Sequence, residues 1–137
     1  MSAANCTFEV RGIPAPQGSK RHVGNGVLIE SSKLVKPWRE AVKWAALELL
    51  LPAHGGRPLD GPLRASLIFT LARPVSAPKG RTHPDRKPDL DKLIRSTLDA
   101  ITDAGLIADD ARIVELRASK IYGAVPGATI AITEIAP

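Results

Sequence analysis

The chain of 137 residues is 44% hydrophobic and 24% charged, which is typical of one globular domain that buries about two-thirds of its unfolded surface. Lys and Arg outnumber Asp and Glu by 19 to 14, and the resulting formal charge of +5 favours a polyanionic partner, although many basic domains bind no nucleic acid. The single cysteine, Cys6, excludes an intrachain disulfide, the first ten residues lack a secretory signal pattern, and no apolar run reaches the ~18 residues that span a bilayer.

The first thirty residues predict extended structure interrupted by a basic segment. Residues 6–12 alternate apolar and polar side chains, which predicts a strand. Residues 13–26 contain prolines and glycines that break regular structure, so they predict a basic loop or hairpin. Residues 27–30 predict a short strand.

A helix is predicted over residues 37–51, where apolar side chains recur at helical spacing. Pro37 suits the first turn of this helix, and Pro52 is expected to end it. We expect Trp38 and Trp44 to pack in the core rather than to stack on bases, since aromatic residues make up only 4% of the chain.

The middle of the chain predicts a strand, a loop and a second helix. Residues 63–72 form a short apolar segment typical of a central strand. Residues 72–88 carry several prolines and an excess of bases, which predicts a basic Pro-rich loop within the domain. From Leu90 to about Gly105 the apolar residues lie on one helical face.

Two further strands are predicted at residues 111–122 and 128–135, joined by a Val-Pro-Gly turn into a hairpin. The predicted order is β, β, α, β, α, β, β. We therefore expect an α/β fold: a single-domain two-layer sandwich over residues 1–137, with a mixed sheet packed against two main helices.

The sequence KPDLDKLIR (87–95) places two carboxylates at the start of the second predicted helix. In a structural interpretation, Asp89 is the N-cap and Asp91 interacts with the helix dipole. Asp91, Arg95 and Asp99 are also spaced for an ion-pair ladder worth tenths of a kcal/mol per pair. Nothing in this interpretation is strained.

A metal-binding interpretation adds the acidic residues Asp109 and Asp110, which follow this helix. If the chain doubles back, Asp89, Asp91 and Asp110 would form an all-oxygen cluster of the kind that suits Mg²⁺ or Mn²⁺. The helix between them is about 22 Å long, so the sequence alone leaves their convergence open. The three histidines have no spacing typical of a zinc site, and no GxxxxGK[ST] phosphate loop is present.

The segment KPDLDKLIRSTLDAITDAGLIADDARIVELRASKIYG (87–123) resembles the signature of the RusA-type Holliday junction resolvases, endonucleases of prophages and bacteria. The family pattern begins Pro-Asp-Leu-Asp-Asn-Leu after a basic residue, and later has Asp-Asp-X-Gln/Arg-Ile/Val. VRGIPAPQGSKR (10–21) is similar to the opening segment of that family. The similarity runs from about residue 7 to the C-terminus and implies a RusA-like fold.

The resemblance implies that Asp89, Asp91 and Asp110 are magnesium-binding catalytic residues, with Asp109 assisting. The family has a functional lysine where this chain has Arg95, and usually has asparagine where it has Lys92. We therefore expect Arg95, and Lys92 with it, to stabilise charge on the phosphate, although arginine is a poor proton donor.

The resemblance implies an Mg²⁺-dependent endonuclease that resolves four-way DNA junctions in recombination and repair. Its expected partners are branched DNA and a second copy in a homodimer, with no membrane and no small-molecule cofactor, and its expected location is the cytoplasm, at the nucleoid. Apolar strands at 67–72 and 128–135 are expected to offer edges to the second copy. The alternatives are a junction-binding protein with weak or no activity, and a metal-dependent nuclease of RNA or flaps. Bases expected to bind the DNA backbone are Lys20, Arg21, Lys79, Arg81, Arg86, Lys87 and Lys120.

Overall fold

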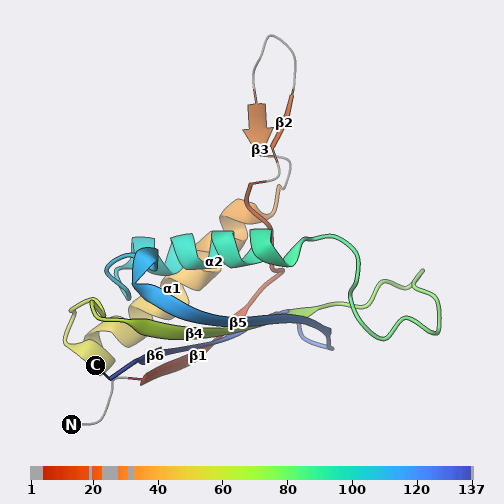
Figure 1. The fold of residues 1–137 in the computed structure, drawn as a ribbon. Coiled ribbons are helices and arrows are strands. Elements are labelled where there is room, and N and C mark those ends of the chain that lie inside the picture. The colour runs from red at the N-terminus through yellow and green to blue at the C-terminus, as the bar shows by residue number, and fades with distance from the viewer. Residues whose placement is uncertain (1–4, 19, 23–27, 31–32, 137) are drawn as a thin grey trace.

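The computed structural model describes residues 5–18, 20–22, 28–30 and 33–136 (Figure 1). The elements follow the order β1 (Asn5–Arg11), β2 (Lys20–His22), β3 (Leu28–Glu30), α1 (Val35–His54), β4 (Leu63–Leu71), α2 (Leu90–Ala104), the 3-10 helix η1 (Asp110–Arg112), β5 (Ile113–Tyr122) and β6 (Gly127–Glu134). The predicted α/β class, with a mixed sheet and two main helices, is confirmed.

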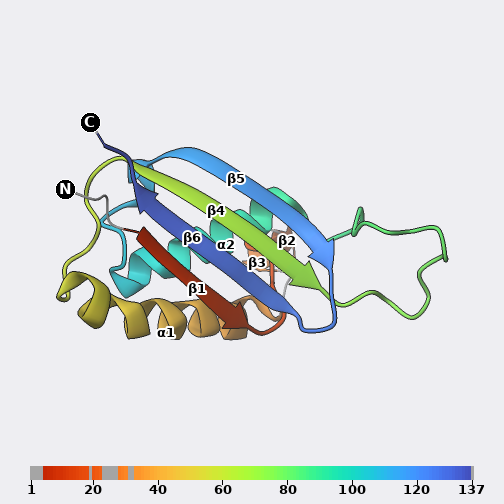
Figure 2. The same ribbon diagram turned by 90° about the horizontal axis from the view of Figure 1, so that it is seen from below.

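The main sheet has the strand order β1-β6-β4-β5. β4 and β5 are parallel, whereas β6 is antiparallel to both β1 and β4. A parallel pair requires a crossover connection, and α2 provides it between β4 and β5. Both helices cover the same face of the sheet, so the molecule has two layers (Figures 1 and 2).

The core lies between this sheet face and the helices. Along β4, Leu63, Leu67 and Phe69 are fully buried while Arg64 and Ile68 are exposed, as expected for a strand with one covered face. Trp38 of α1 is buried as predicted. Its indole Nε1–H donates to the Thr97 hydroxyl of α2 at 3.1 Å, which joins the two helices inside the core.

The predicted hairpin between the last two strands is wrong. β6 turns back at Gly127 but pairs with β1 and β4 rather than with β5. The burial of side chains explains this choice, because Ile130 and Ile132 of β6 are fully buried while Val114 of β5 is largely exposed. The more apolar strand occupies the centre of the sheet, and β5 occupies its rim (Figure 2).

Two expectations for the first helix also need correction. α1 continues past Pro52 to His54, since a proline removes one backbone donor but permits helical φ; Gly55, at φ +62°, follows the last helical residue. Trp44 is 64% exposed rather than buried. It lies six residues after Trp38, about 240° around the helix axis, and therefore faces away from the core.

The strand edges differ from the expected ones. The apolar strands β4 and β6 are interior, so neither offers an edge to a partner. The edges of the main sheet belong to β1 and β5.

Separately, β2 and β3 form a hairpin that projects above the first turns of α2 (Figures 1 and 2). Within the described residues, no helix is both long and apolar enough to cross a membrane.

Candidate active site

The start of α2 is held in place by β5. The Lys120 ammonium donates hydrogen bonds to the backbone carbonyls of Arg86 and Pro88, each at 2.9 Å. The Lys87–Pro88 peptide bond between these acceptors is cis. Lys120 therefore fixes the backbone immediately before Asp89. The sequence predicted a phosphate contact for this lysine, and the structure shows two of its donors already used within the chain.

Asp89 occupies the N-cap position of α2, but its side chain makes no capping hydrogen bond. Its carboxylate instead lies 3.5 Å from the Lys92 amine, in an ion pair that leaves the Asp89 side chain 52% exposed. Asp91 lies in the first helical turn and is also exposed. Because neither carboxylate is used to complete the helix, both remain accessible to a ligand.

The predicted ion-pair ladder along α2 is not formed. Asp99 accepts a hydrogen bond from the Gln17 side chain at 2.6 Å. The Arg95 side chain extends beside Gly18, where an added Cβ would lie 2.7 Å from the guanidinium Nη1. Gly18 has φ +99°, a conformation that glycine adopts readily, so it accommodates both the turn and the arginine.

The segment before Gly18 packs along α2 through two more contacts. The buried Ser96 hydroxyl donates to the carbonyl of Ala15 at 2.6 Å, and the Gln17 N–H donates to the carbonyl of Lys92 at 3.0 Å. The N-terminal segment that resembles the family's opening segment, residues 10–21, therefore packs on α2 and positions Arg95 and the surface around it.

Asp109 and Asp110 lie at the other end of β5, where η1 begins. The Asp109 carboxylate accepts the Ala111 N–H at 2.9 Å, and this hydrogen bond, with one shared with Asp110, lowers the pKa of Asp109. Sharing that hydrogen bond raises the pKa of Asp110, and partial desolvation and the negative charges of Asp109 and Asp99 act in the same direction. Both carboxylates are exposed.

The chain does not bring Asp110 to Asp89 and Asp91. β5 runs back along the direction opposite to α2, so its first residues lie near the C-terminal half of the helix and its last residues near the helix start (Figure 1). In the part of the chain that the structure describes, no three His, Cys, Asp or Glu side chains could hold a metal ion together. The ligand set of three aspartates stays a prediction.

The loop of residues 72–88 extends beyond the end of β4 (Figure 1). Contacts of its own arginine side chains stabilise its conformation. The Arg73 guanidinium donates to the carbonyls of Ala77, Pro78 and Arg81. Asp85 forms ion pairs with Arg81 at 3.7 Å and with Arg86 at 3.0 Å.

The predicted DNA-binding bases have different environments. Lys79 and Lys87 are exposed, and no ion pair forms at either within the described residues. Arg86 is exposed while Arg81 is half-buried. The backbone of Lys20 and Arg21 belongs to β2, and their side chains lie outside the described residues. The members of the predicted DNA-binding set that are exposed among the described side chains therefore all lie on the loop that leads into α2.

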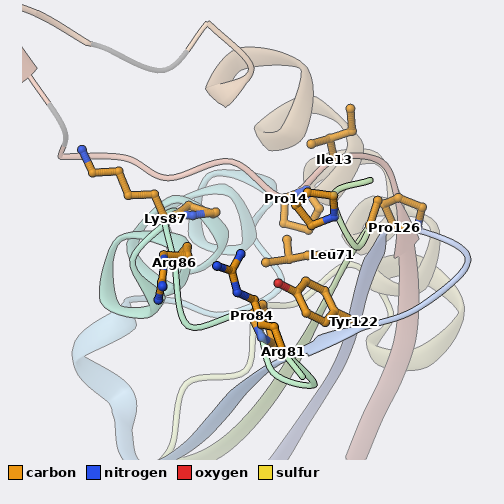
Figure 3. A pocket seen from close by; sticks show the side chains of 12 residues that line it. Ile13, Pro14, Leu71, Arg81, Pro84, Arg86, Lys87, Tyr122 and Pro126 are labelled. Carbon is orange, nitrogen blue, oxygen red and sulfur yellow. The ribbon is translucent and has the colours of Figure 1, made fainter. Parts of the chain in front are cut away.

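A cavity of about 280 Å³ is lined in part by this loop (Figure 3). Its walls are mainly apolar, formed by prolines, Leu71 and the ring of Tyr122, and Arg81, Arg86 and Lys87 contribute to its lining. The cavity adjoins Pro88, directly before the carboxylate pair. The site thus combines two carboxylates, a basic loop and a concave apolar surface.

Comparison with known proteins shows the family of this chain. The family described as Endodeoxyribonuclease RusA matches residues 9–133. The chain belongs to the RusA family. It is also 29% identical over 136 residues to the uncharacterized protein YqaN of Bacillus subtilis (strain 168), a match that covers 93% of this chain and 95% of that protein. The predicted resemblance to RusA is confirmed, and the family supports endonuclease activity on DNA.

Three residues at the RusA-like site were not selected from the sequence. Gln17 and Gly18 position Asp99 and Arg95, and their only sequence signal was the Pro-Gln-Gly motif. Tyr122 lines the cavity, although the sequence marks it only as the last residue of a strand. The strand register that brings Tyr122 to the end of β4 is a long-range property that local patterns do not specify.

Proposed function

We propose that the protein is a magnesium-dependent endonuclease that resolves four-way DNA junctions in recombination and repair. The observation that carries this proposal is the pair of exposed carboxylates, Asp89 and Asp91, at the start of α2. The pair adjoins a loop with exposed Lys and Arg side chains, in a chain that belongs to the RusA family. Two carboxylates repel a phosphate group unless a cation is bound between them. The neighbouring Lys and Arg side chains attract the DNA backbone.

The residues present fit a hard divalent cation in part. Asp89 and Asp91 offer exposed oxygen donors, and Mg²⁺ is commonly bound by one or two carboxylates together with water and phosphate oxygens. When bound, Mg²⁺ or Mn²⁺ supplies an activated water and neutralises charge on the scissile phosphate. Asp110 lies near Asp99, further along α2, and not beside this pair within one chain.

The cationic side chains of α2 have separate roles in this proposal. Arg95 lies on the exposed surface and presents a guanidinium that can stabilise charge on phosphoryl oxygens through two hydrogen bonds. Lys92 lies against Asp89 and partly neutralises it. Lys79, Arg86 and Lys87 position the DNA backbone from the 72–88 loop, while Lys120 holds the start of α2.

The ion pair between Lys92 and Asp89 also favours a second candidate function. A lysine amine 3.5 Å from a metal-binding carboxylate competes with the cation for it. A protein with this pair would bind four-way junctions through its basic surface with weak or no cleavage. In both proposals the protein acts at the nucleoid in the cytoplasm, as a homodimer on branched DNA and without a small-molecule cofactor, in the manner of a prophage-type resolvase.

A cleavage and binding assay distinguishes these candidates. The protein is incubated with a labelled synthetic four-way junction, a linear duplex, a flap and an RNA duplex, with Mg²⁺ or with EDTA. Symmetric Mg²⁺-dependent nicks in the junction alone support the resolvase. Selective binding of the junction without nicks supports the second candidate, and preferential cleavage of flaps or RNA contradicts both.

A further inference from the structure

The cavity beside the start of α2 has stiff, apolar walls. A volume of about 280 Å³ lies at the small end of ligand sites, so it suits a group about as large as one nucleobase. A proline ring fixes its own backbone φ, and a cavity that is already formed loses little conformational entropy when a ligand enters. Five of the twelve lining residues are prolines: Pro14, Pro74, Pro84, Pro88 and Pro126.

Two side chains in these walls carry hydrogen-bonding groups that the described residues do not use. The Arg81 side chain is only 21% exposed, and its one ion pair within the described residues, with Asp85 at 3.7 Å, is longer than a hydrogen bond. The hydroxyl of the half-buried Tyr122 makes no hydrogen bond within the same residues. Figure 3 shows both groups pointing into the space between the lining side chains. Neither is sealed from solvent, so a ligand can reach both.

The rim of the cavity is cationic. Arg86 and Lys87 contribute to its lining and are exposed, and among the described residues that line it none is acidic. Asp85 forms ion pairs with Arg81 and Arg86, and no ion pair forms at Lys87 within the described part of the chain. An apolar interior with a cationic rim suits a ligand that has a flat apolar part and an anionic part.

We propose that this cavity binds one unstacked nucleobase of the DNA strand that enters the active site. The ring of Tyr122 packs against the base, and Arg81, which has donors and no acceptor, binds the oxygens or ring nitrogens of its edge. Arg86 and Lys87 contact the phosphates on either side of the base. This inference deepens the proposed function and rests on it.

The position of the cavity next to the carboxylate pair favours a base of the substrate over a free small molecule. Pro88 lines the cavity and directly precedes Asp89. Lys120 donates to the carbonyl of Pro88 at 2.9 Å, and it lies two residues before Tyr122 on the same face of β5. These contacts hold the cavity wall and the start of α2 together. A base in the cavity therefore keeps a neighbouring phosphate close to the carboxylates.

The cavity also provides a physical reason for selecting a branched substrate. Within a duplex each base is stacked on both sides, and removing it from the stack costs free energy. Where strands change partners at a branch point the stacking is interrupted, so the cost is lower there. A cavity that requires an unstacked base therefore favours a junction, whereas the phosphate contacts of the 72–88 loop favour junctions and duplexes alike.

Tyr122 can report occupancy of the cavity, because it is the single tyrosine of the chain. The protein is labelled with fluorotyrosine and titrated without metal with dGMP, dAMP, dCMP and dTMP, and with deoxyribose phosphate as the matched anion without a base. We expect the fluorine resonance to shift saturably with nucleotides and not with deoxyribose phosphate. The shift should saturate first with dGMP, because guanine offers adjacent N7 and O6 acceptors to an arginine. An equal shift with deoxyribose phosphate, or no shift with any nucleotide, overturns the proposal.

Leu71→Trp tests the same cavity on DNA. Leu71 lines the cavity and lies opposite Tyr122 in the register of β4 and β5, so an indole ring there would fill the space. The matched control is Ile68→Trp, which adds the same ring to the face of β4 that the helices do not cover, where Ile68 is 38% exposed. Circular dichroism and unfolding in urea show whether each variant keeps the fold.

A scan with abasic residues locates the base that enters the cavity. Single nucleotides around the branch point of a four-way junction are replaced one at a time, and binding is measured without Mg²⁺. We expect one position at which loss of the base weakens binding of the wild type and of Ile68→Trp by about tenfold, which is in the lower part of the range for stacking of one base. The same replacement should leave binding of Leu71→Trp unchanged. The salt slope should be equal in all three proteins, because the phosphate contacts are kept.

Nicking with Mg²⁺ is measured on the same samples, so that the cavity and the nuclease are tested separately. A shift that requires a base, together with a sensitive position that Leu71→Trp lacks, supports the cavity; if no sample then nicks the junction, only the proposed nuclease is refuted. Wild-type nicking without a shift that requires a base overturns the cavity and leaves the nuclease standing. No sensitive position, or an equal abasic effect in Leu71→Trp, also overturns the cavity.

Two smaller substitutions make the same test if Leu71→Trp does not fold. Tyr122→Phe removes only the hydroxyl, and Arg81→Lys keeps the charge but removes the planar fork of donors. We expect each variant to bind dGMP several-fold more weakly by titration calorimetry, with the salt slope of junction binding unchanged. Wild-type affinity for dGMP in both variants overturns the proposal.

Discussion

Replacing Lys120 by Met tests whether this side chain positions the active site or binds DNA. The substitution keeps the length and apolar stem of the side chain but removes the ammonium that donates to Arg86 and Pro88 at 2.9 Å. A hydrogen bond from a charged group stabilises a protein by about 1.5–3 kcal/mol, and partial exposure reduces this value. We expect the two bonds together to contribute about 2 kcal/mol to the free energy of unfolding.

Equilibrium unfolding in urea measures this loss against Lys79→Met, which removes an exposed charge from the same basic surface and should cost little. Cleavage and binding are then compared across salt concentrations. If Lys120 positions the active site, Lys120→Met should lower kcat and leave the salt slope of junction binding unchanged. If Lys120 binds phosphate, Lys120→Met should flatten that slope by about one. Equal stability of the two variants, with the flattened slope confined to Lys120→Met, refutes the positioning role.

Three further predictions concern the helix, the loop and the sheet. Arg95→Ala should lower kcat strongly while Arg95→Lys retains activity, and a wild-type rate for Arg95→Ala would remove this residue from the site. A double Ala substitution at Arg86 and Lys87 should weaken binding to junctions and duplexes alike and flatten the salt slope by roughly one to two. Gly127→Ala should destabilise the fold by about 3 kcal/mol, because its Cβ would lie 2.1 Å from the Val10 carbonyl oxygen; a urea midpoint like that of the wild type would contradict this contact.

Local patterns in the sequence were sufficient to predict most elements of the fold. The short apolar run of β4 and the apolar face of α2 are short-range signals, and each element formed close to its predicted position. The pairing of β6 was missed because its two neighbours, β1 and β4, are both distant from it in the sequence. Strand order depends on which strand buries the most apolar surface, and the burial of Ile130 and Ile132 became evident only in three dimensions.

The candidate site was likewise predictable where local signals identify its residues and not where long-range contacts place them. The sequence singled out Asp89 and Asp91 from their place at a helix start, and the family resemblance added Arg95; the structure places all three on its exposed surface. The sequence left open whether Asp110 would join them, and only the family resemblance implied a shared ligand set; in the structure β5 runs in the direction opposite to α2 (Figure 1). Lys120 was selected for its charge alone, whereas its contact with the carbonyl of Pro88 depends on the parallel register of β4 and β5.

Cleavage of a four-way junction by Asp89→Asn and Asp91→Asn tests the central claim most directly. The matched control is Asp85→Asn, which removes an exposed carboxylate from the neighbouring loop without altering the pair at the helix start. We predict that both helix variants bind the junction at least as tightly as the wild type, because a negative charge beside phosphate is lost, and that neither nicks it with Mg²⁺. Asp85→Asn should cut at the wild-type rate. Normal nicking by both helix variants would show that the carboxylate pair serves only the structure of α2, and the proposed active site would be wrong.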